Sequence, residues 1–201
     1  LSDGAPPVVH SVDFAVAVRT RFFIAVTVAY TFIFAAQVGG IQHLVKLVEE
    51  RSTTSLAATA TLVLAASSVV ARLAGGQLTM RLPMLGFTVG CAAVQGVSLL
   101  AIASVEVTAG LMASIALFGA TVGNLLMLHP LLVGAKFGPR DYPRIFSRSQ
   151  LIVFVGTAAG PYLLGALHDA AGDYLMAYLV AGTLSLLGAA VLSRAGALAR
   201  S

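Results

Sequence analysis

The sequence is poor in cysteine and in charged side chains, and it lacks a nucleotide-binding phosphate loop. Its one cysteine, Cys91, can form neither an internal disulfide nor a cysteine-rich metal site. No Gly-x-x-x-x-Gly-Lys-Ser/Thr motif is present, so this segment has no P-loop for ATP. Charged residues make up 10% of the chain, against about 25% in a typical soluble domain. We therefore expect no cofactor and no metal, and so little charge points to a membrane protein.

Long apolar runs dominate the sequence, which is 58% hydrophobic with a mean hydropathy of +0.94. A hydrocarbon core about 30 Å thick requires roughly 20 helical residues, whereas barrel strands would be about 10 residues long and alternating. The runs therefore predict an all-α, multi-pass membrane protein with six transmembrane helices. These span Phe22 to Leu44, Ser55 to Leu78, Met84 to Ala103, Ala109 to Val133, Gln150 to Leu167 and Tyr174 to Leu192.

Lysine and arginine collect on alternate sides of these stretches. Ten of the twelve fall on one side and only Lys46 and Arg51 on the other. The ten are Arg19, Arg21, Arg72, Arg81, Lys136, Arg140, Arg144, Arg148, Arg194 and Arg200. Basic loops remain in the cytoplasm, so we expect both ends of this segment to be cytoplasmic in the plasma or inner membrane. The same bias explains the pI near 9.6 without a nucleic-acid partner.

The spans divide the chain into three parts. Residues 1–20 are predicted to be the remnant of a cytoplasmic linker, residues 21–193 the six-helix transmembrane half of a transporter, and residues 194–201 a cytoplasmic tail. The first residue is Leu1 rather than methionine, which predicts a piece of a longer protein. The helices form two groups of three with opposite topology, a 3+3 inverted repeat that recurs among transporters. The longest loop, Gly134 to Ser149, is expected to be a solvated cytoplasmic face, with anionic lipid as a second contact.

Glycine and proline are placed as in packed membrane helices. Three small-xxx-small pairs, Gly86/Gly90, Gly119/Gly123 and Gly156/Gly160, predict close approaches between helices. Pro161 lies inside the fifth stretch and removes one backbone hydrogen bond there, so it is either a hinge or a static kink.

Polar side chains recur at helical spacing in four of the stretches. The sets are Thr27, Tyr30, Phe34 and Gln37; Thr61, Ser68 and Arg72; Thr88, Cys91, Gln95 and Ser98; and Ser114, Thr121 and Asn124. At these depths polar groups face the helix bundle or a wet cavity rather than lipid. For the stripe containing Gln95 we favour packing, because nothing ionisable accompanies it. For the other three, interhelical hydrogen bonding and a substrate cavity both remain open.

Among the residues of the six spans, Arg72 is the strongest single indication of a functional site. It lies roughly 9 Å inside the cytoplasmic end of its helix, and no acidic residue in the six spans can neutralise it. A bound anion could do so, because the guanidinium fork matches a carboxylate. A snorkelling arginine is weighted equally. His129 could relay protons, although a packing role is favoured. An intramembrane serine protease using Ser98 with His129 remains a minor alternative.

Several segments resemble helices seven to twelve of Major Facilitator Superfamily transporters. The run Gly160-Pro161-Tyr162-Leu163-Leu164-Gly165-Ala166-Leu167-His168-Asp169, continuing to Tyr178, resembles the eleventh helix, outer turn and start of the twelfth helix. Arg72 to Leu78 with Arg81 resembles the end of helix eight and its loop, where Met80 replaces the usual acid. Phe137 to Phe146 resembles the loop after helix ten.

Within the superfamily, His43-Leu44-Val45 and Arg72 are most similar to the monocarboxylate and oxalate:formate branch, with Ser68 where that branch often has aspartate. The resemblance implies secondary active transport of a small organic anion by a protein that is not an enzyme and has no catalytic residues. It also implies an N-terminal six-helix half as partner. The implied substrate-binding residues are Tyr30, Phe34, Gln37, Ser68, Arg72, Thr121 and Asn124. A drug or neutral-solute exporter and a six-helix membrane enzyme remain alternatives.

Overall fold

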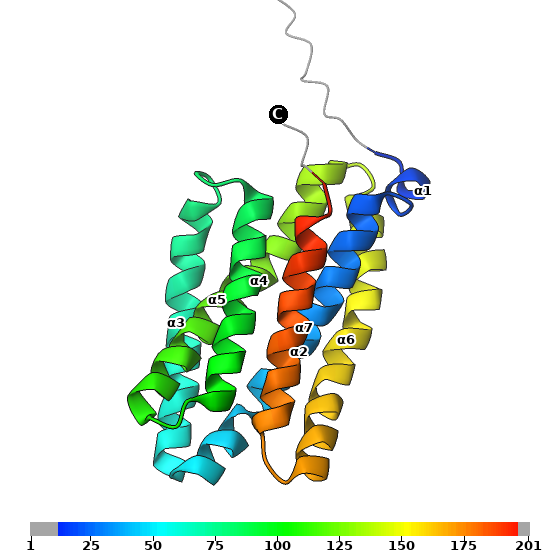
Figure 1. Ribbon diagram of the computed structural model, residues 1–201. Helices are drawn as coiled ribbons and strands as arrows, with labels where there is room; N and C mark the ends of the chain where they lie inside the picture. Colours follow the sequence, from blue (N-terminus) through cyan, green and yellow to red (C-terminus); the bar gives the residue numbers. More distant parts are fainter. Residues whose placement is uncertain (1–11, 197–201) are drawn as a thin grey trace, which may run out of the picture.

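The computed structural model describes residues 12–196, which form seven α-helices and no strand within that range (Figure 1). A short helix α1 (Phe14–Ala17) precedes six long ones. These are α2 (Arg21–Arg51), α3 (Thr54–Leu78), α4 (Met84–Ser104), α5 (Thr108–Phe137), α6 (Tyr142–Ala171) and α7 (Leu175–Ser193). All six are long and apolar enough to cross a membrane. The all-α fold with six candidate spans is therefore confirmed. The first eleven residues of the expected linker, with His10, and residues 197–201 of the tail lie outside the described range.

Local chemistry explains where the helices begin and end. The hydroxyls of Thr20 and Thr53 accept hydrogen bonds from the backbone N–H groups of Phe23 and Leu56 and so cap α2 and α3. Gly138 and Gly172 follow α5 and α6 with φ of 76° and 80°, a region that favours glycine because it lacks a Cβ atom. These signals place the turns between helices.

Several boundaries differ from the sequence prediction, including the end of α2 at Arg51 rather than Leu44. The expected long loop from Gly134 to Ser149 is mostly helix, because α5 continues to Phe137 and α6 begins at Tyr142. Hydropathy marks only the apolar part of a helix, whereas here the helices extend beyond it with Arg144 and Arg148 on an exposed face. The expected linker also contains a helix, α1, whose Phe14 N–H donates to Asp141 Oδ2 at 3.0 Å.

The helices pack with the symmetry that an inverted repeat predicts. α2 packs mainly on α6 and α7, α5 packs mainly on α3 and α4, and α4 packs on α7. If α2, α3 and α4 are exchanged for α5, α6 and α7 in that order, the same pairs of contacting helices are obtained. The described chain begins and ends at the same end of the bundle (Figure 1). The fold is therefore two helix triplets related as a 3+3 repeat.

Two of the three predicted glycine pairs make close helix contacts. A Cβ atom on Gly156 or Gly160 would overlap backbone of α2, and one on Gly119 or Gly123 would overlap backbone of α3. The third prediction is wrong within the described chain, because a Cβ atom on Gly86 or Gly90 meets nothing within 4 Å. Spacing alone cannot tell whether a partner helix lies opposite the pair.

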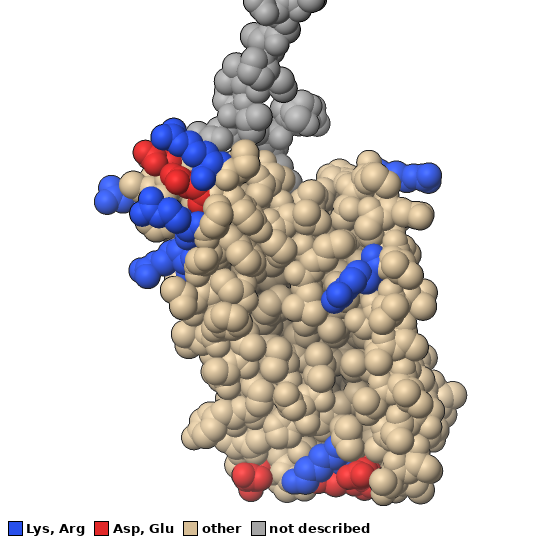
Figure 2. Space-filling model, turned by 180° about the vertical axis from the view of Figure 1, so that it is seen from behind, with Lys and Arg blue, Asp and Glu red and all other residues tan. Residues whose placement is uncertain are grey.

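Charges gather at the two ends of the bundle, and the broad face between them is nearly free of charge (Figure 2). Blue and red atoms occur at both ends in this view. The helix bounds place Arg140 and Arg144 at the end with the α5–α6 loop, and the acids Glu49, Glu50, Glu106, Asp169 and Asp173 at the opposite end. This distribution agrees with helices that cross an apolar layer.

Candidate functional site

Arg72 lies on an exposed face of α3 and reaches across the backbone of α5. Its Nε donates to the carbonyl oxygen of Gly123 at 3.2 Å. It forms no ion pair with any described residue. The terminal nitrogens of the guanidinium are therefore available to another acceptor. No carboxylate in the described part of the chain forms an ion pair with them.

The close contact between α3 and α5 explains this position. Gly123 has no side chain, and a Cβ atom there would overlap the carbonyl oxygen of Ser68. The two backbones can therefore approach, which brings the α5 carbonyl within reach of Arg72, one turn after Ser68. The structure thus brings Ser68 and Arg72 together beside Gly123.

Tyr30 and Phe34 lie on α2 and pack around His129 of α5. The Tyr30 ring stacks on the imidazole with centroids 4.3 Å apart, and the Phe34 ring meets it edge-on at 6.3 Å. Tyr30 is fully buried and Phe34 nearly so. These two predicted site residues therefore lie together, on a different helix from Arg72 and inside the bundle.

A hydrogen-bonded polar chain joins three helices beside these rings. His129 Nε2 lies 3.1 Å from Ser149 Oγ on α6, which lies 2.9 Å from Thr27 Oγ1 on α2. Hydropathy places Ser149 in the predicted loop from Gly134 to Ser149, so the sequence prediction misses it. The buried series Ile145, Ser149 and Val153, spaced by four residues, was the available signal.

The Ser98–His129 pairing of the protease alternative is not formed. Ser98 Oγ donates to the carbonyl of Gln95 in its own helix. Ser149 does meet His129, but both are buried, and no described acidic side chain is buried beside them to orient the imidazole. This geometry does not favour hydrolysis, which needs access for water and an oriented base.

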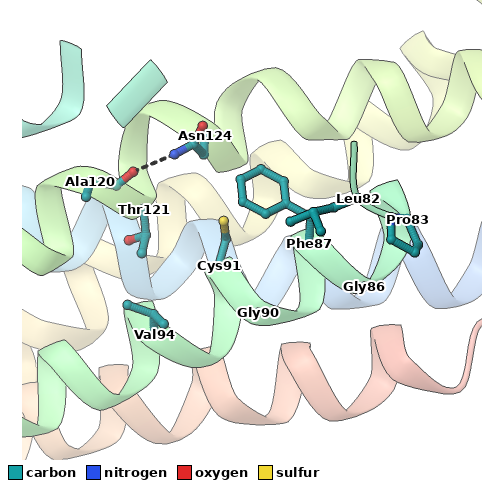
Figure 3. A pocket seen from close by; sticks show the side chains of 10 residues that line it. All are labelled: Leu82, Pro83, Gly86, Phe87, Gly90, Cys91, Val94, Ala120, Thr121 and Asn124. Carbon is teal, nitrogen blue, oxygen red and sulfur yellow. Dashed lines mark hydrogen bonds between the residues drawn. The ribbon is translucent and has the colours of Figure 1, made fainter. Parts of the chain in front are cut away.

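Thr121 and Asn124 line an apolar groove of about 480 Å³ between α4 and α5 (Figure 3). Asn124 Nδ2 donates to the carbonyl of Ala120, and its Oδ1 lies against Gly75 of α3.

Gln37 is buried on α2. Tyr30 OH, Gln37 Oε1 and Asn124 Oδ1 are sealed from solvent and have no hydrogen-bond partner among the described residues.

No group of three or more His, Cys, Asp or Glu side chains that could hold a metal occurs within residues 12–196.

The polar stripe on α4 that contains Gln95 has the packing role expected for it. Gln95 Nε2 donates to the carbonyl of Ile33 at 3.0 Å and to Ser185 Oγ at 3.1 Å, which ties α4 to α2 and α7.

No protein-family model matches the chain, and no curated protein matches it. Among solved structures it is similar to a crystal structure of the E. coli fucose:proton symporter FucP, with a TM-score of 0.79 and 17% identity. The match covers 92% of this chain and 46% of the symporter, so the chain spans about half the length of that protein. At this identity the likeness concerns the fold alone, which resembles about half of that symporter.

Proposed function

We propose that this chain is one half of a secondary active transporter for a small organic anion, such as a monocarboxylate. The observation that carries the substrate class is Arg72, a guanidinium on a candidate span with no ion-pair partner among the described residues. Charged groups at membrane depth are costly and usually mark substrate or ion pathways. A carboxylate would satisfy the planar fork of donors in a bidentate manner.

Ser68 lies beside Arg72 and offers a hydroxyl to the same anion. The other proposed substrate-binding residues lie on α2 and α5: Tyr30, Phe34, Gln37, Thr121 and Asn124. Three of them bury a polar atom that has no hydrogen-bond partner within residues 12–196. Such atoms are expensive in an apolar medium, which supports a role for them when the cavity opens.

The exposed faces of α3 and α6 support a partner half. Only 11% of the most apolar window of α3 and 22% of that of α6 are buried, against 67% in α2 and 61% in α5. Both faces present large apolar side chains, including Leu73 and Tyr162. In the proposal an N-terminal six-helix half packs against α3 and α6. Transport then results from rocking of the two halves about a site near the bilayer midplane.

Uptake by the complete protein with Arg72→Lys and Arg72→Gln tests the anion site. We expect the glutamine variant to lose transport of lactate and oxalate at least about tenfold, and the lysine variant to raise the KM because a point charge cannot bind bidentately. Arg81→Gln, in the α3–α4 loop, is the matched control. Unchanged uptake and affinity in both Arg72 variants would remove Arg72 from the site. Competition by lipophilic cations instead of carboxylates would favour the drug-exporter alternative.

A further inference from the structure

A groove opens between α2 and α7 at the end of the bundle where the described chain begins and ends (Figure 1). Its volume is about 370 Å³. It is lined by four residues of α2, by one residue of α7 and by the residue that follows α7: Arg21, Ile24, Ala25, Val28, Val191 and Arg194. None of them belongs to the proposed substrate-binding set, so the groove is a separate feature of the fold.

The lining of this groove changes from charged to apolar along the helix axes. Arg21 is the first residue of α2, and Val28 lies about 10 Å further into the bundle at 1.5 Å per residue. On the other side, Arg194 lies one turn beyond Val191. In a bilayer crossed by both helices, this order places the arginines near the headgroups and the apolar side chains beside the lipid tails. The groove is therefore amphipathic in the same order as a phospholipid.

The apolar floor of the groove is open to the surroundings of the bundle. Ile24 is 52% exposed and Val28 is 37% exposed. Deeper in the bundle the two helices come into contact, because a Cβ atom on Gly188 of α7 would lie only 2.9 Å from the carbonyl oxygen of Ala29 on α2. The groove therefore ends where these two backbones meet, and its other end opens at the two arginines.

Neither arginine of the groove forms an ion pair with a described residue. The described acids at this end of the bundle are Asp13 and Asp141, and both belong to the contact with α1, where Asp141 accepts from the Phe14 N–H. A guanidinium binds phosphate oxygens well, because its planar fork of donors matches their geometry. The retention of basic residues on the cytoplasmic side explains arginines at a helix end, but it does not require an apolar groove beneath them.

We propose that this groove binds an anionic phospholipid, with the phosphate at Arg21 and Arg194 and one acyl chain along the apolar floor. The negative headgroup complements the two guanidinium groups, each of which can bind phosphate oxygens through paired donors. In the expected orientation the lipid belongs to the cytoplasmic leaflet, where anionic lipids are concentrated. The bound lipid joins the beginning of α2 to the end of α7. This inference requires that the helices span a membrane, and it is independent of the transported substrate.

The first test concerns the headgroup. Native mass spectrometry of the complete protein measures the binding of phosphatidylglycerol, with phosphatidylcholine of the same acyl chains as the zwitterionic reference. We expect the double variant Arg21→Gln/Arg194→Gln to bind phosphatidylglycerol at least about tenfold more weakly, since each arginine near anionic lipid contributes about fivefold. Arg81→Gln removes an exposed arginine from the α3–α4 loop and is the matched control, with a change below about twofold. Equal losses in both proteins, or no loss in the double variant, would overturn the proposal.

The second test concerns the acyl chain. Ala25→Phe fills the apolar floor and leaves both arginines in place, so we expect it to weaken phosphatidylglycerol binding about as much as the loss of one arginine. Val97→Phe, on an exposed face of α4, is the matched control and should leave binding unchanged. Unchanged binding in Ala25→Phe would overturn the proposal.

Glycerophosphoglycerol, the headgroup without its tails, identifies the source of the phosphate. We expect it not to displace phosphatidylglycerol, because it cannot occupy the apolar floor. Displacement at the same concentration as intact lipid would assign the groove to a soluble phosphate and overturn the proposal. The same spectra report the oligomeric state. Dimers that dissociate in Ala25→Phe, without a change in lipid binding, would assign the groove to a second copy of the chain instead.

Discussion

Gly96 of α4 and Gly182 of α7 contact each other reciprocally. A Cβ atom built on either glycine would lie 2.9 Å from the carbonyl oxygen of the other. Each would also approach the leucine four residues after its partner, Leu186 in one case and Leu100 in the other. α4 and α7 are the third helices of the two triplets, so this mutual contact is what an inverted repeat produces at its axis.

Gly96→Ala and Gly182→Ala should each destabilise the protein by about 1–3 kcal/mol, because the added methyl group has no room between two backbones. Gly86→Ala and Gly90→Ala on the same helix are the matched controls. They should be neutral or slightly stabilising, since their Cβ positions are open and alanine is the better helix former. Thermal unfolding followed by circular dichroism suits a chain without tryptophan. Equal effects in both pairs would contradict the contact.

Gln95 is expected to couple α4 to α7 through Ser185. In a double-mutant cycle with Gln95→Met and Ser185→Ala, we expect a coupling free energy of about 0.6 kcal/mol, and at most about 1.7. Ser98→Ala is the control, because its hydroxyl bonds only within its own helix. The free energy of unfolding in detergent provides the measurement, and additive single effects would show that the Gln95–Ser185 bond contributes nothing.

Asp141 should hold α1 against the α5–α6 loop over a wide pH range. The hydrogen bond from the Phe14 N–H lowers the pKa of this carboxyl below its usual value, with further contributions from Asp13, Arg144 and Arg140. A depressed folded-state pKa stabilises docking above the ordinary pKa, and the effect is lost only as the pH falls through the lower value.

Hydrogen exchange at residues 14–17 measures this docking. We expect similar protection at pH 5 and pH 8 in the wild type, and faster exchange in Asp141→Ala at both. Asp169→Asn, at the opposite end of the bundle, should leave these amides unchanged. Protection lost in the wild type between pH 8 and pH 5 would show that another group controls α1.

The two ends of the bundle should lie in different compartments. In a Cys91→Ser background, a cysteine at Glu106 should react with a membrane-impermeant maleimide from outside the cell. A cysteine at Arg140 should react only after permeabilisation, because basic loops are retained inside. Both positions are exposed, so accessibility in the fold does not limit either reaction. Labelling of both from outside would reject the proposed topology.

Much of the helical framework follows from local sequence. Apolar length identifies the spans, caps such as Thr20 and glycines such as Gly172 identify their ends, and the distribution of arginine indicates an orientation. Each is a property of one segment and the solvent around it. The packing role of Gln95 also follows from the sequence, because its stripe contains no charged residue.

Only the tertiary structure decided which segments meet. It brought the backbone of α3 against Gly123 and that of α2 against Gly160, whereas no described residue lies against Gly90. It placed Arg72 over a bare α5 carbonyl, and it put His129 beside Ser149, a residue assigned to a loop by hydropathy. These relations join residues far apart in the chain, and a periodic pattern gives the face of one helix but not the helix opposite. Close backbone contact and hydrogen bonding require both partners, so they exist only after the helices have packed.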